Sequence, residues 1–145
     1  MNKLQMWMRI DRYRMEGVIT PIIGDYIVDK KDKTFKADLI GSMILTHVGP
    51  TKFGVDEMPA IEPGVVSGLV KIYTSREIAV LECAYEDKIF EWSKEYLSET
   101  DIGLLNDFFN LGYAPPINMP KDRYKWFIKN LIKSEGDIEA AMNMV

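Results

Sequence analysis

The sequence predicts an α+β fold: an N-terminal antiparallel β-sheet packed on a long central helix, with two or three shorter C-terminal helices. Short β-capable runs separated by turn residues fill residues 1–73. A capped helical pattern covers about 75–97, and helical patterns broken by Pro and Gly fill about 100–145. The 145 residues are 47% hydrophobic, enough to bury a core, so we expect a single compact domain over 1–145.

The first run predicts a half-buried strand, because its apolar residues occupy alternate positions, namely Leu4, Met6, Met8 and Ile10. A second apolar run, residues 17–24, contains Pro21, which cannot donate to a sheet ladder. It is therefore expected to be an edge strand or an extended loop.

Residues 25–28 and 34–40 flank the polar segment 29–33 and predict a β-hairpin. Residues 42–48 predict a further strand. The next twenty residues, 49–68, contain four Gly and three Pro, so no long regular element is expected there. Such a connection is either functional or an extended cover over the core, and residues 69–73 are expected to form a last strand.

The central helix has the strongest local signals. Thr74 and Glu77 have the spacing of a capping box. Apolar residues then recur every three or four positions on one face: Ile78, Leu81, Tyr85, Ile89, Trp92 and Tyr96. Acidic residues fall mostly opposite: Glu82, Glu86, Asp87, Glu91 and Glu95. A strand over 78–85 is the competing interpretation, because that stretch is almost wholly apolar.

The C-terminal part predicts three helices. Residues 98–101 can cap the first, which is expected to end near Gly112. After the Pro-rich link 114–120, with Pro120 suited to a first helical turn, an amphipathic helix is expected over Lys121–Lys133. Asp137 can cap a last short helix.

Composition limits the partners. The formal net charge is −4, and residues 61–115 hold four basic and ten acidic side chains. Nucleic-acid binding is disfavoured, since it needs a basic surface. No apolar run is long enough for a membrane span, and we see no signal peptide, so no membrane partner is expected. The single cysteine, Cys83, excludes an internal disulfide and favours a reducing, cytoplasmic setting.

Arg9, Arg12 and Arg14, with Tyr13 among them, form a small basic cluster near the start of the chain. Such a cluster could contact an anion or an acidic patch of a partner. Pairing with the acidic central helix of the same chain is the favoured interpretation.

His47, the only histidine, lies where the Gly- and Pro-rich loop begins, and Asp56 follows on that loop. A His–carboxylate pair could perform general acid–base catalysis if the loop folds back, so His47 is a weak catalytic candidate. Thr51 and Lys52 complete the ligand-loop candidates. A phosphate-binding loop is rejected, because Val55 and Asp56 occupy the places that require Lys and Ser or Thr.

No metal or cofactor is expected. One Cys and one His cannot build a structural zinc site. The acidic stretch 85–95 lacks the loop pattern of a calcium-binding hand. Cys83 is expected to be a buried, inert thiol.

Residues 136–145 resemble the last helix of ubiquitin-associated-type three-helix bundles, and Leu111-Gly112-Tyr113 resembles the turn after their first helix. The resemblance covers about residues 100–145. It departs from the pattern at the Pro-rich link 114–120 and at the long second helix. It would imply a peptide- or protein-docking module.

The favoured function is that of a small non-catalytic protein-binding protein of inhibitor, immunity or adaptor type, which could form a homo-oligomer. It would act through an acidic, aromatic-bearing surface built from Glu86, Asp87, Glu91, Glu95 and Trp126. The alternative is a small-ligand-binding protein or hydrolase with its site at the loop His47–Gly68.

Overall fold

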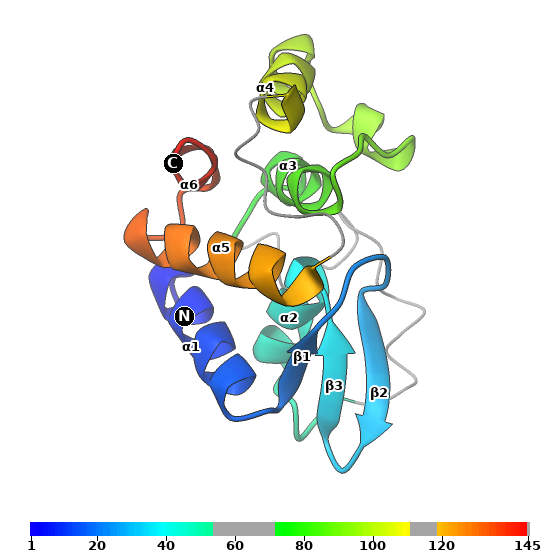
Figure 1. The fold of residues 1–145 in the computed structure, drawn as a ribbon, viewed down its shortest axis with the longest axis vertical. Helices are drawn as coiled ribbons and strands as arrows, with labels where there is room; N and C mark the ends of the chain where they lie inside the picture. The colour runs from blue at the N-terminus through cyan, green and yellow to red at the C-terminus, as the bar shows by residue number, and fades with distance from the viewer. Residues whose placement is uncertain (54–71, 111–118, 145) are drawn as a thin grey trace.

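The computed structural model describes residues 1–53, 72–110 and 119–144, and it confirms the α+β class. A three-stranded sheet is formed by residues of the N-terminal part, and helices lie on one side of it (Figure 1). The described C-terminal half is helical. None of the described helices is long and apolar enough to cross a membrane. In chain order the elements are α1 (Lys3–Met15), β1 (Ile19–Pro21), β2 (Ile27–Lys31), β3 (Thr34–Ala37), α2 (Leu39–Val48), α3 (Ser75–Glu86), a 3-10 helix (Trp92–Glu95), α4 (Glu99–Asn110), α5 (Pro120–Lys133) and α6 (Ile138–Met142).

The predicted first strand is wrong, because the segment is helix α1. Asn2 caps it through a capping box: its side chain accepts from the Gln5 N–H at 2.8 Å, and Gln5 accepts from the Asn2 N–H at 3.0 Å. The buried side chains are Met6, Trp7 and Ile10, a helical spacing, whereas Met8 is exposed. The alternation suggested by the sequence therefore does not match the buried face.

The predicted hairpin is confirmed. β2 pairs antiparallel with β3, and the turn residues Asp32 and Lys33 both have positive φ, 52° and 60°. This is the conformation that a two-residue turn needs to match the strand twist. β1 pairs parallel with β3 at the sheet edge, as Pro21 requires.

The predicted strand at 42–48 is also wrong, because these residues belong to α2. The hairpin strand ends at Ala37, and Asp38 then caps the helix by accepting from the Gly41 N–H at 2.7 Å. Every residue from Leu39 to Thr46 is buried, since α2 packs between α1 and α3. A helix buried all round has no polar face, so its sequence shows no helical period.

Helix α3 begins as predicted, with the Thr74–Glu77 capping box in place. It ends at Glu86, earlier than the predicted residue 97, because Asp87 takes the left-handed conformation at the C-cap. The chain then turns into the 3-10 helix, and Trp92 and Tyr96 still pack against the core while half-buried.

The three C-terminal helices are confirmed. Pro120 opens α5, and Asp137 caps α6 by accepting from the Ala140 N–H at 3.0 Å. The predicted C-cap Gly112, the Pro-rich link up to residue 118, and most of the loop and strand predicted over 54–71 lie outside the described residues.

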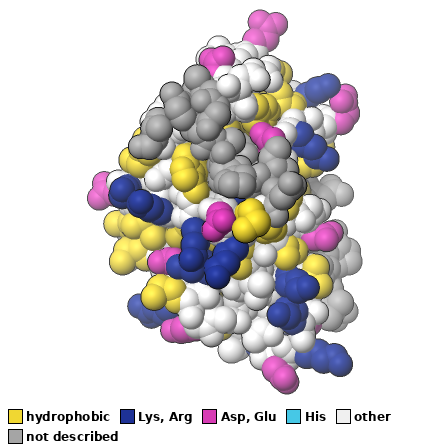
Figure 2. Space-filling model, in the orientation of Figure 1, with side chains coloured by type: hydrophobic (Ala, Val, Ile, Leu, Met, Phe, Trp, Pro, Cys, Tyr) yellow, Lys and Arg dark blue, Asp and Glu magenta, His cyan; other side chains and the backbone are white. Residues whose placement is uncertain are grey.

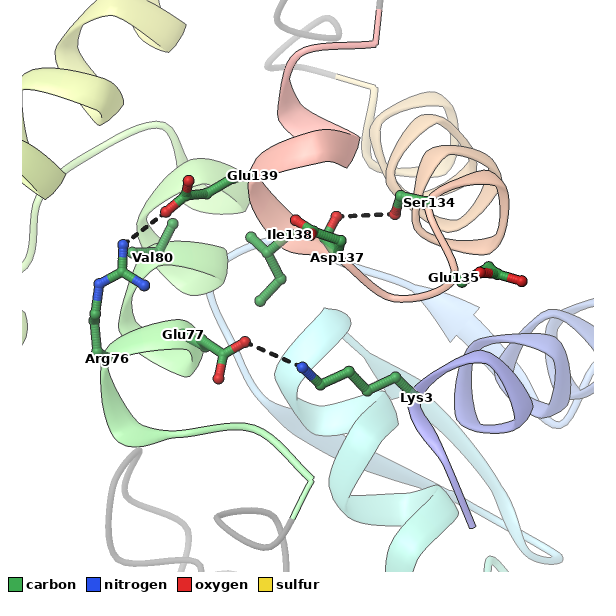
Figure 3. A pocket seen from close by; sticks show the side chains of 9 residues that line it. All are labelled: Lys3, Arg76, Glu77, Val80, Ser134, Glu135, Asp137, Ile138 and Glu139. Atoms are coloured by element: carbon green, nitrogen blue, oxygen red, sulfur yellow. Dashed lines mark hydrogen bonds and ion pairs between the residues drawn. The ribbon is translucent and has the colours of Figure 1, made fainter.

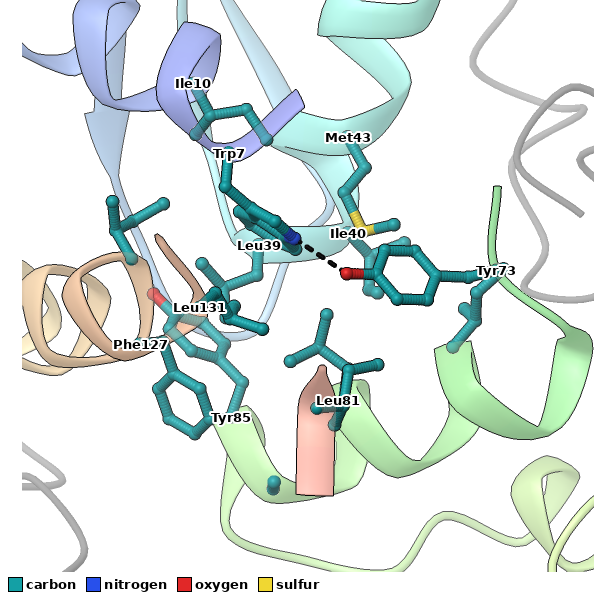
Figure 4. Close-up of a cluster of buried hydrophobic side chains, with 14 of the residues drawn as sticks. Trp7, Ile10, Leu39, Ile40, Met43, Tyr73, Leu81, Tyr85, Phe127 and Leu131 are labelled. Carbon is teal, nitrogen blue, oxygen red and sulfur yellow. Dashed lines mark hydrogen bonds between the residues drawn. The ribbon is translucent and has the colours of Figure 1, made fainter. Parts of the chain in front are cut away.

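Aromatic and aliphatic side chains from α1, α2, α3 and α5 meet in one core (Figure 4). A buried polar chain crosses it: the Trp7 indole N–H donates to the Tyr73 hydroxyl at 2.9 Å, and Tyr73 donates to the Gly136 carbonyl. These two bonds tie α1, the start of α3 and the turn before α6 together, so the N- and C-terminal parts share one interior.

Candidate functional site

Three carboxylates converge where the start of α2 meets α3. Asp38 comes from the N-cap of α2, and Glu82 and Glu86 lie one turn apart on α3. Residues four apart on a helix point to the same side, so both glutamates face Asp38. One oxygen from each of the three lies within 4.8 Å of the others. We call this group the carboxylate cluster.

Backbone N–H groups hold two members of the cluster in place. Asp38 Oδ1 accepts from Gly41 N at 2.7 Å, which is also the cap of α2. Glu86 Oε1 accepts from Gly24 N at 3.0 Å. Each of these carboxylates is therefore fixed through one oxygen.

The cluster contains two buried oxygens without a hydrogen-bond partner in the described part of the chain, Asp38 Oδ2 and Glu82 Oε2. Asp38 is 1% exposed and Glu82 is 3% exposed. An ionised carboxylate without a partner is very unfavourable at such depth. The site therefore favours an occupant that brings positive charge, either a cation or a proton.

The pKa values of the three carboxyl groups are consistent with a site that favours a cation or a proton. Burial, followed by the charge of Glu82, raises the pKa of Asp38 well above its usual value. Burial and the charge of Glu86 raise the pKa of Glu82 to about 8. Burial also raises the pKa of Glu86, although the Gly24 N–H opposes the shift. The largest cause of each shift is the same: burial removes the water that would otherwise stabilise the ionised carboxylate.

A hollow of about 250 Å³ opens beside the cluster. Its other lining residues are Gly24, Tyr26, Lys88 and Phe90. The Lys88 ammonium lies 4.5 Å from the centre of the Phe90 ring, so an aromatic face holds the one cation of this lining. The hollow has room for an ion and several of its waters, so the carboxylates need not supply every ligand.

The predicted partner-binding residues are distributed over different environments. Glu86 belongs to the carboxylate cluster, and Asp87 forms the C-cap of α3. Glu91 and Glu95 are exposed around the 3-10 helix. Trp126 is half-buried on α5, with its ring 5.9 Å from Phe108. Their role in binding a partner stays a prediction.

The ligand-loop candidates lie away from the cluster. His47 is exposed in the last turn of α2, and Thr51 and Lys52 are exposed in the turn that follows. None of these three lines the hollow beside the carboxylates. Asp56, the predicted partner of His47, lies outside the described residues. The His–carboxylate pair stays a prediction.

The predicted pairing of the N-terminal arginines with the acidic helix is not seen for Arg14. Its guanidinium binds Asp11 of the same helix at 2.8 Å. Arg9 and Arg12 are exposed on α1.

Sequence reasoning missed Asp38 and Glu82. The sequence pattern predicts a strand through Asp38, where an acid after Ala37 carries no signal. It predicts a solvated face for Glu82, yet Glu82 stands between Leu81 and Cys83 in the most apolar stretch of the helix. An acid inside such a stretch was the available signal, because α3 buries every residue from Ile78 to Tyr85.

A second hollow, of about 480 Å³, lies between α1, α3 and α6 (Figure 3). Two ion pairs cross it: Arg76 binds Glu139 at 2.7 Å, and Lys3 approaches Glu77 at 3.4 Å. Arg76 also makes two bonds through Nε and one through Nη2 to Asp101. Glu135 lines the hollow without an ion pair to another described residue but is exposed to water, and none of the lining residues has a buried polar atom without a partner, so no lining group indicates a ligand.

Comparison of the chain with protein-family models, with curated proteins and with solved structures gave no match. Its function therefore has to be inferred from its own residues. Among those described, the carboxylate cluster is the group whose chemistry requires an occupant.

Proposed function

We propose that the protein binds one hard divalent cation at Asp38, Glu82 and Glu86. The observation that carries this proposal is the pair of buried carboxylate oxygens, Asp38 Oδ2 and Glu82 Oε2, without a hydrogen-bond partner among the described residues. A cation would supply that partner to both. All three ligands are carboxylates, the type that Mg²⁺, Mn²⁺ and Ca²⁺ prefer.

The spacing of the oxygens fits such an ion. Ca–O distances of about 2.4 Å place opposite ligands about 4.8 Å apart, and Mg–O distances of about 2.1 Å place them about 4.2 Å apart. The cluster spans at most 4.8 Å. This upper limit does not exceed the span of opposite ligands around calcium, so the three oxygens are close enough to share one ion. Waters in the adjoining hollow would complete the coordination.

The charge of the cluster also favours a cation. Three ionised carboxylates outnumber the two positive charges that act on Glu86, those of Arg123 and Lys88, so a net negative charge remains for the ion to offset. In the absence of the ion, the raised pKa values of Asp38 and Glu82 favour a shared proton in its place. Cation binding therefore releases protons, and its affinity should increase as the pH rises.

The test is thermal unfolding of chelator-treated protein at pH 7.5, with Mg²⁺, Mn²⁺ or Ca²⁺ added up to about 10 mM, which covers weak sites. At least one ion should raise the Tm by about 3 °C or more. Glu82→Gln should abolish the rise. Glu91→Gln is the matched control, because the Glu91 side chain is 89% exposed.

Isothermal titration of the same samples should give one ion per chain. A Tm that none of the three ions changes would show that the occupant of the cluster is a proton only. A rise that Glu82→Gln keeps in full would place the ion elsewhere. Either result would overturn the proposal.

Protein binding through an acidic surface is the second proposal. It is supported by Phe90 and Trp92, half-buried rings that stack 5.7 Å apart beside the exposed Glu91 and Glu95. A cytoplasmic setting and a homo-oligomeric state belong to the same proposal. Light scattering tests self-association, and reversal of both acids to Lys should abolish partner capture. Capture unchanged by that reversal would remove this surface from consideration.

A further inference from the structure

Helix α5 exposes a row of lysines. Lys121, Lys125, Lys129 and Lys133 recur every four residues and are all exposed. Four such positions extend about 18 Å along a helix. None of the four makes an ion pair with another described residue. We call them the lysine ridge. Lys and Arg side chains gather in the middle of the face drawn in Figure 2, where α5 crosses the molecule.

The first half of this ridge borders a groove of about 640 Å³ between α1, β1 and α5. Lys121 and Lys125 line one side of it, and Arg14 lines another. Between them lie apolar side chains, Ile19, Pro21 and Met15, of which Met15 is 72% exposed. The groove therefore combines an apolar floor with basic margins.

We propose that this groove and the lysine ridge dock an acidic amphipathic segment of a partner protein. The argument is charge complementarity: the ridge lysines form no ion pair with the described residues, and four lysines face one exposed acid, Asp122, within their span. A partner with acids spaced along a helix or strand would pair with them. An apolar side chain of the same segment would occupy the groove against Met15, whose flexible thioether adapts to varied shapes.

A nucleic acid would use the lysines alone, since a phosphate backbone gains nothing from an apolar groove floor. The apolar lining therefore favours a protein segment. This surface is distinct from the carboxylate cluster, because the two hollows share no lining residue.

The probe is a fluorescent twelve-residue peptide in which Glu recurs every four positions and Leu lies between them. Anisotropy at moderate salt should give a saturable Kd below about 100 μM, as for helix-in-groove recognition. The same peptide with each Leu replaced by Ser should bind at least about tenfold more weakly. A twelve-nucleotide single strand of dT is tested in the same assay, to compare binding of a nucleic acid with binding of the peptide.

Lys121→Glu with Lys125→Glu should weaken peptide binding at least about tenfold. The matched control reverses two exposed lysines of the hairpin, Lys30 and Lys36, and should leave the affinity within about twofold. The proposal is overturned if the peptide fails to bind or if the Leu and Ser peptides bind equally. It is also overturned if the two double variants lose the same amount of affinity for the peptide. Tighter binding of the oligonucleotide, lost with the ridge, would assign the surface to nucleic acid instead.

Discussion

Asp38 and Glu82 face one another in the interior, and each keeps one carboxylate oxygen without a hydrogen-bond partner among the described residues. Asp38 is held there because it must cap α2, and Glu82 because α3 buries its whole central stretch. Two acids so placed cannot both ionise cheaply without a counter-charge. The stability of the protein should therefore depend on pH and, if the proposed cation binds, on its concentration.

The metal-free protein should lose stability as the pH rises from 5 to 8.5. Folding raises the pKa of Asp38 and brings that of Glu82 to about 8. The folded state therefore binds more protons than the unfolded state above about pH 4.5, so alkali favours unfolding. We expect a loss on the order of 3 kcal/mol in the free energy of unfolding over this range.

Urea denaturation at the two pH values, with chelator present, measures that loss. Saturating Ca²⁺ or Mg²⁺ should remove most of it, because the ion stabilises the ionised carboxylates. Glu82→Gln should reduce the pH dependence without any ion. Equal stability of the metal-free protein at pH 5 and 8.5 would contradict the buried-acid argument.

The helices with clear ends were predictable from the sequence. Thr74 and Glu77 mark the start of α3 and Asp137 the start of α6, since their side chains cap the helix locally. Pro120 marks the start of α5, because its fixed φ suits the first helical turn. The hairpin was predictable because polar residues 29–33 separate two β-capable runs, although its turn is only Asp32 and Lys33 and residues 29–31 belong to β2. Local chemistry fixes these features, whatever packs against them later.

The strand predictions for α1 and α2 are wrong for different reasons. α1 has an alternating pattern only because Met8 is apolar yet exposed, so the buried face could not be read from polarity. α2 is buried on every side, so it lacks any period. Tertiary packing determines that both segments are helices, and this packing cannot be deduced from the local sequence pattern.

The carboxylate cluster was beyond prediction as a group. Asp38 and Glu82 are 44 positions apart in the sequence, and nothing local indicates that α2 packs on α3 at these residues. Each acid has an ordinary local explanation, a cap or a solvated face. Only their convergence indicates a ligand, and convergence depends on the fold.

Tyr73→Phe should destabilise the protein by about 1–3 kcal/mol, the cost of a buried donor left unpaired. The Tyr73 hydroxyl accepts from the Trp7 indole at 2.9 Å and donates to the Gly136 carbonyl. The change removes both bonds while keeping the ring. Urea denaturation gives the difference in free energy of unfolding.

Tyr96→Phe is the control for that experiment. Tyr96 is half-buried, and its hydroxyl makes no hydrogen bond with the rest of the described chain. Its loss should change the free energy of unfolding by less than about 0.5 kcal/mol. Equal effects of the two substitutions would mean that the Trp7–Tyr73 bond contributes nothing.

Gly41→Ala and Gly103→Ala should have opposite effects. A Cβ at Gly41 would lie 1.7 Å from the Tyr26 carbonyl oxygen and 2.9 Å from Ile27, so α2 could no longer pack against the start of β2. We expect a loss of more than about 3 kcal/mol in the free energy of unfolding, or failure to fold.

Gly103 lies exposed within α4, and an added Cβ would meet nothing within 4 Å. Alanine there should stabilise the protein by about 0.5–1 kcal/mol through helix propensity. Thermal unfolding of the two variants and the parent protein measures both changes in stability. A Gly41→Ala protein as stable as the parent would show that α2 does not approach β2 this closely.

Asp38→Asn and Asp38→Ala separate the two roles of this residue. Asparagine keeps an oxygen for the Gly41 N–H, so the cap of α2 survives, and its amide can donate to Glu82. At pH 8.5 without divalent ions, Asp38→Asn should therefore be at least as stable as the parent protein. Asp38→Ala should be about 1 kcal/mol less stable than Asp38→Asn, because it lacks the cap.

Neither variant should gain the full stabilisation by Ca²⁺ or Mg²⁺ that the parent shows, since a charged ligand is gone from both. Urea denaturation at pH 8.5 measures the difference in stability between each variant and the parent protein, first with chelator and then with excess ion. Asp38→Asn stabilised by the ion as much as the parent would exclude Asp38 from the cation site. If Asp38→Asn is less stable than the parent protein at pH 8.5 without divalent ions, the ionised carboxylate stabilises the folded protein, and the argument from a buried unpaired charge is wrong.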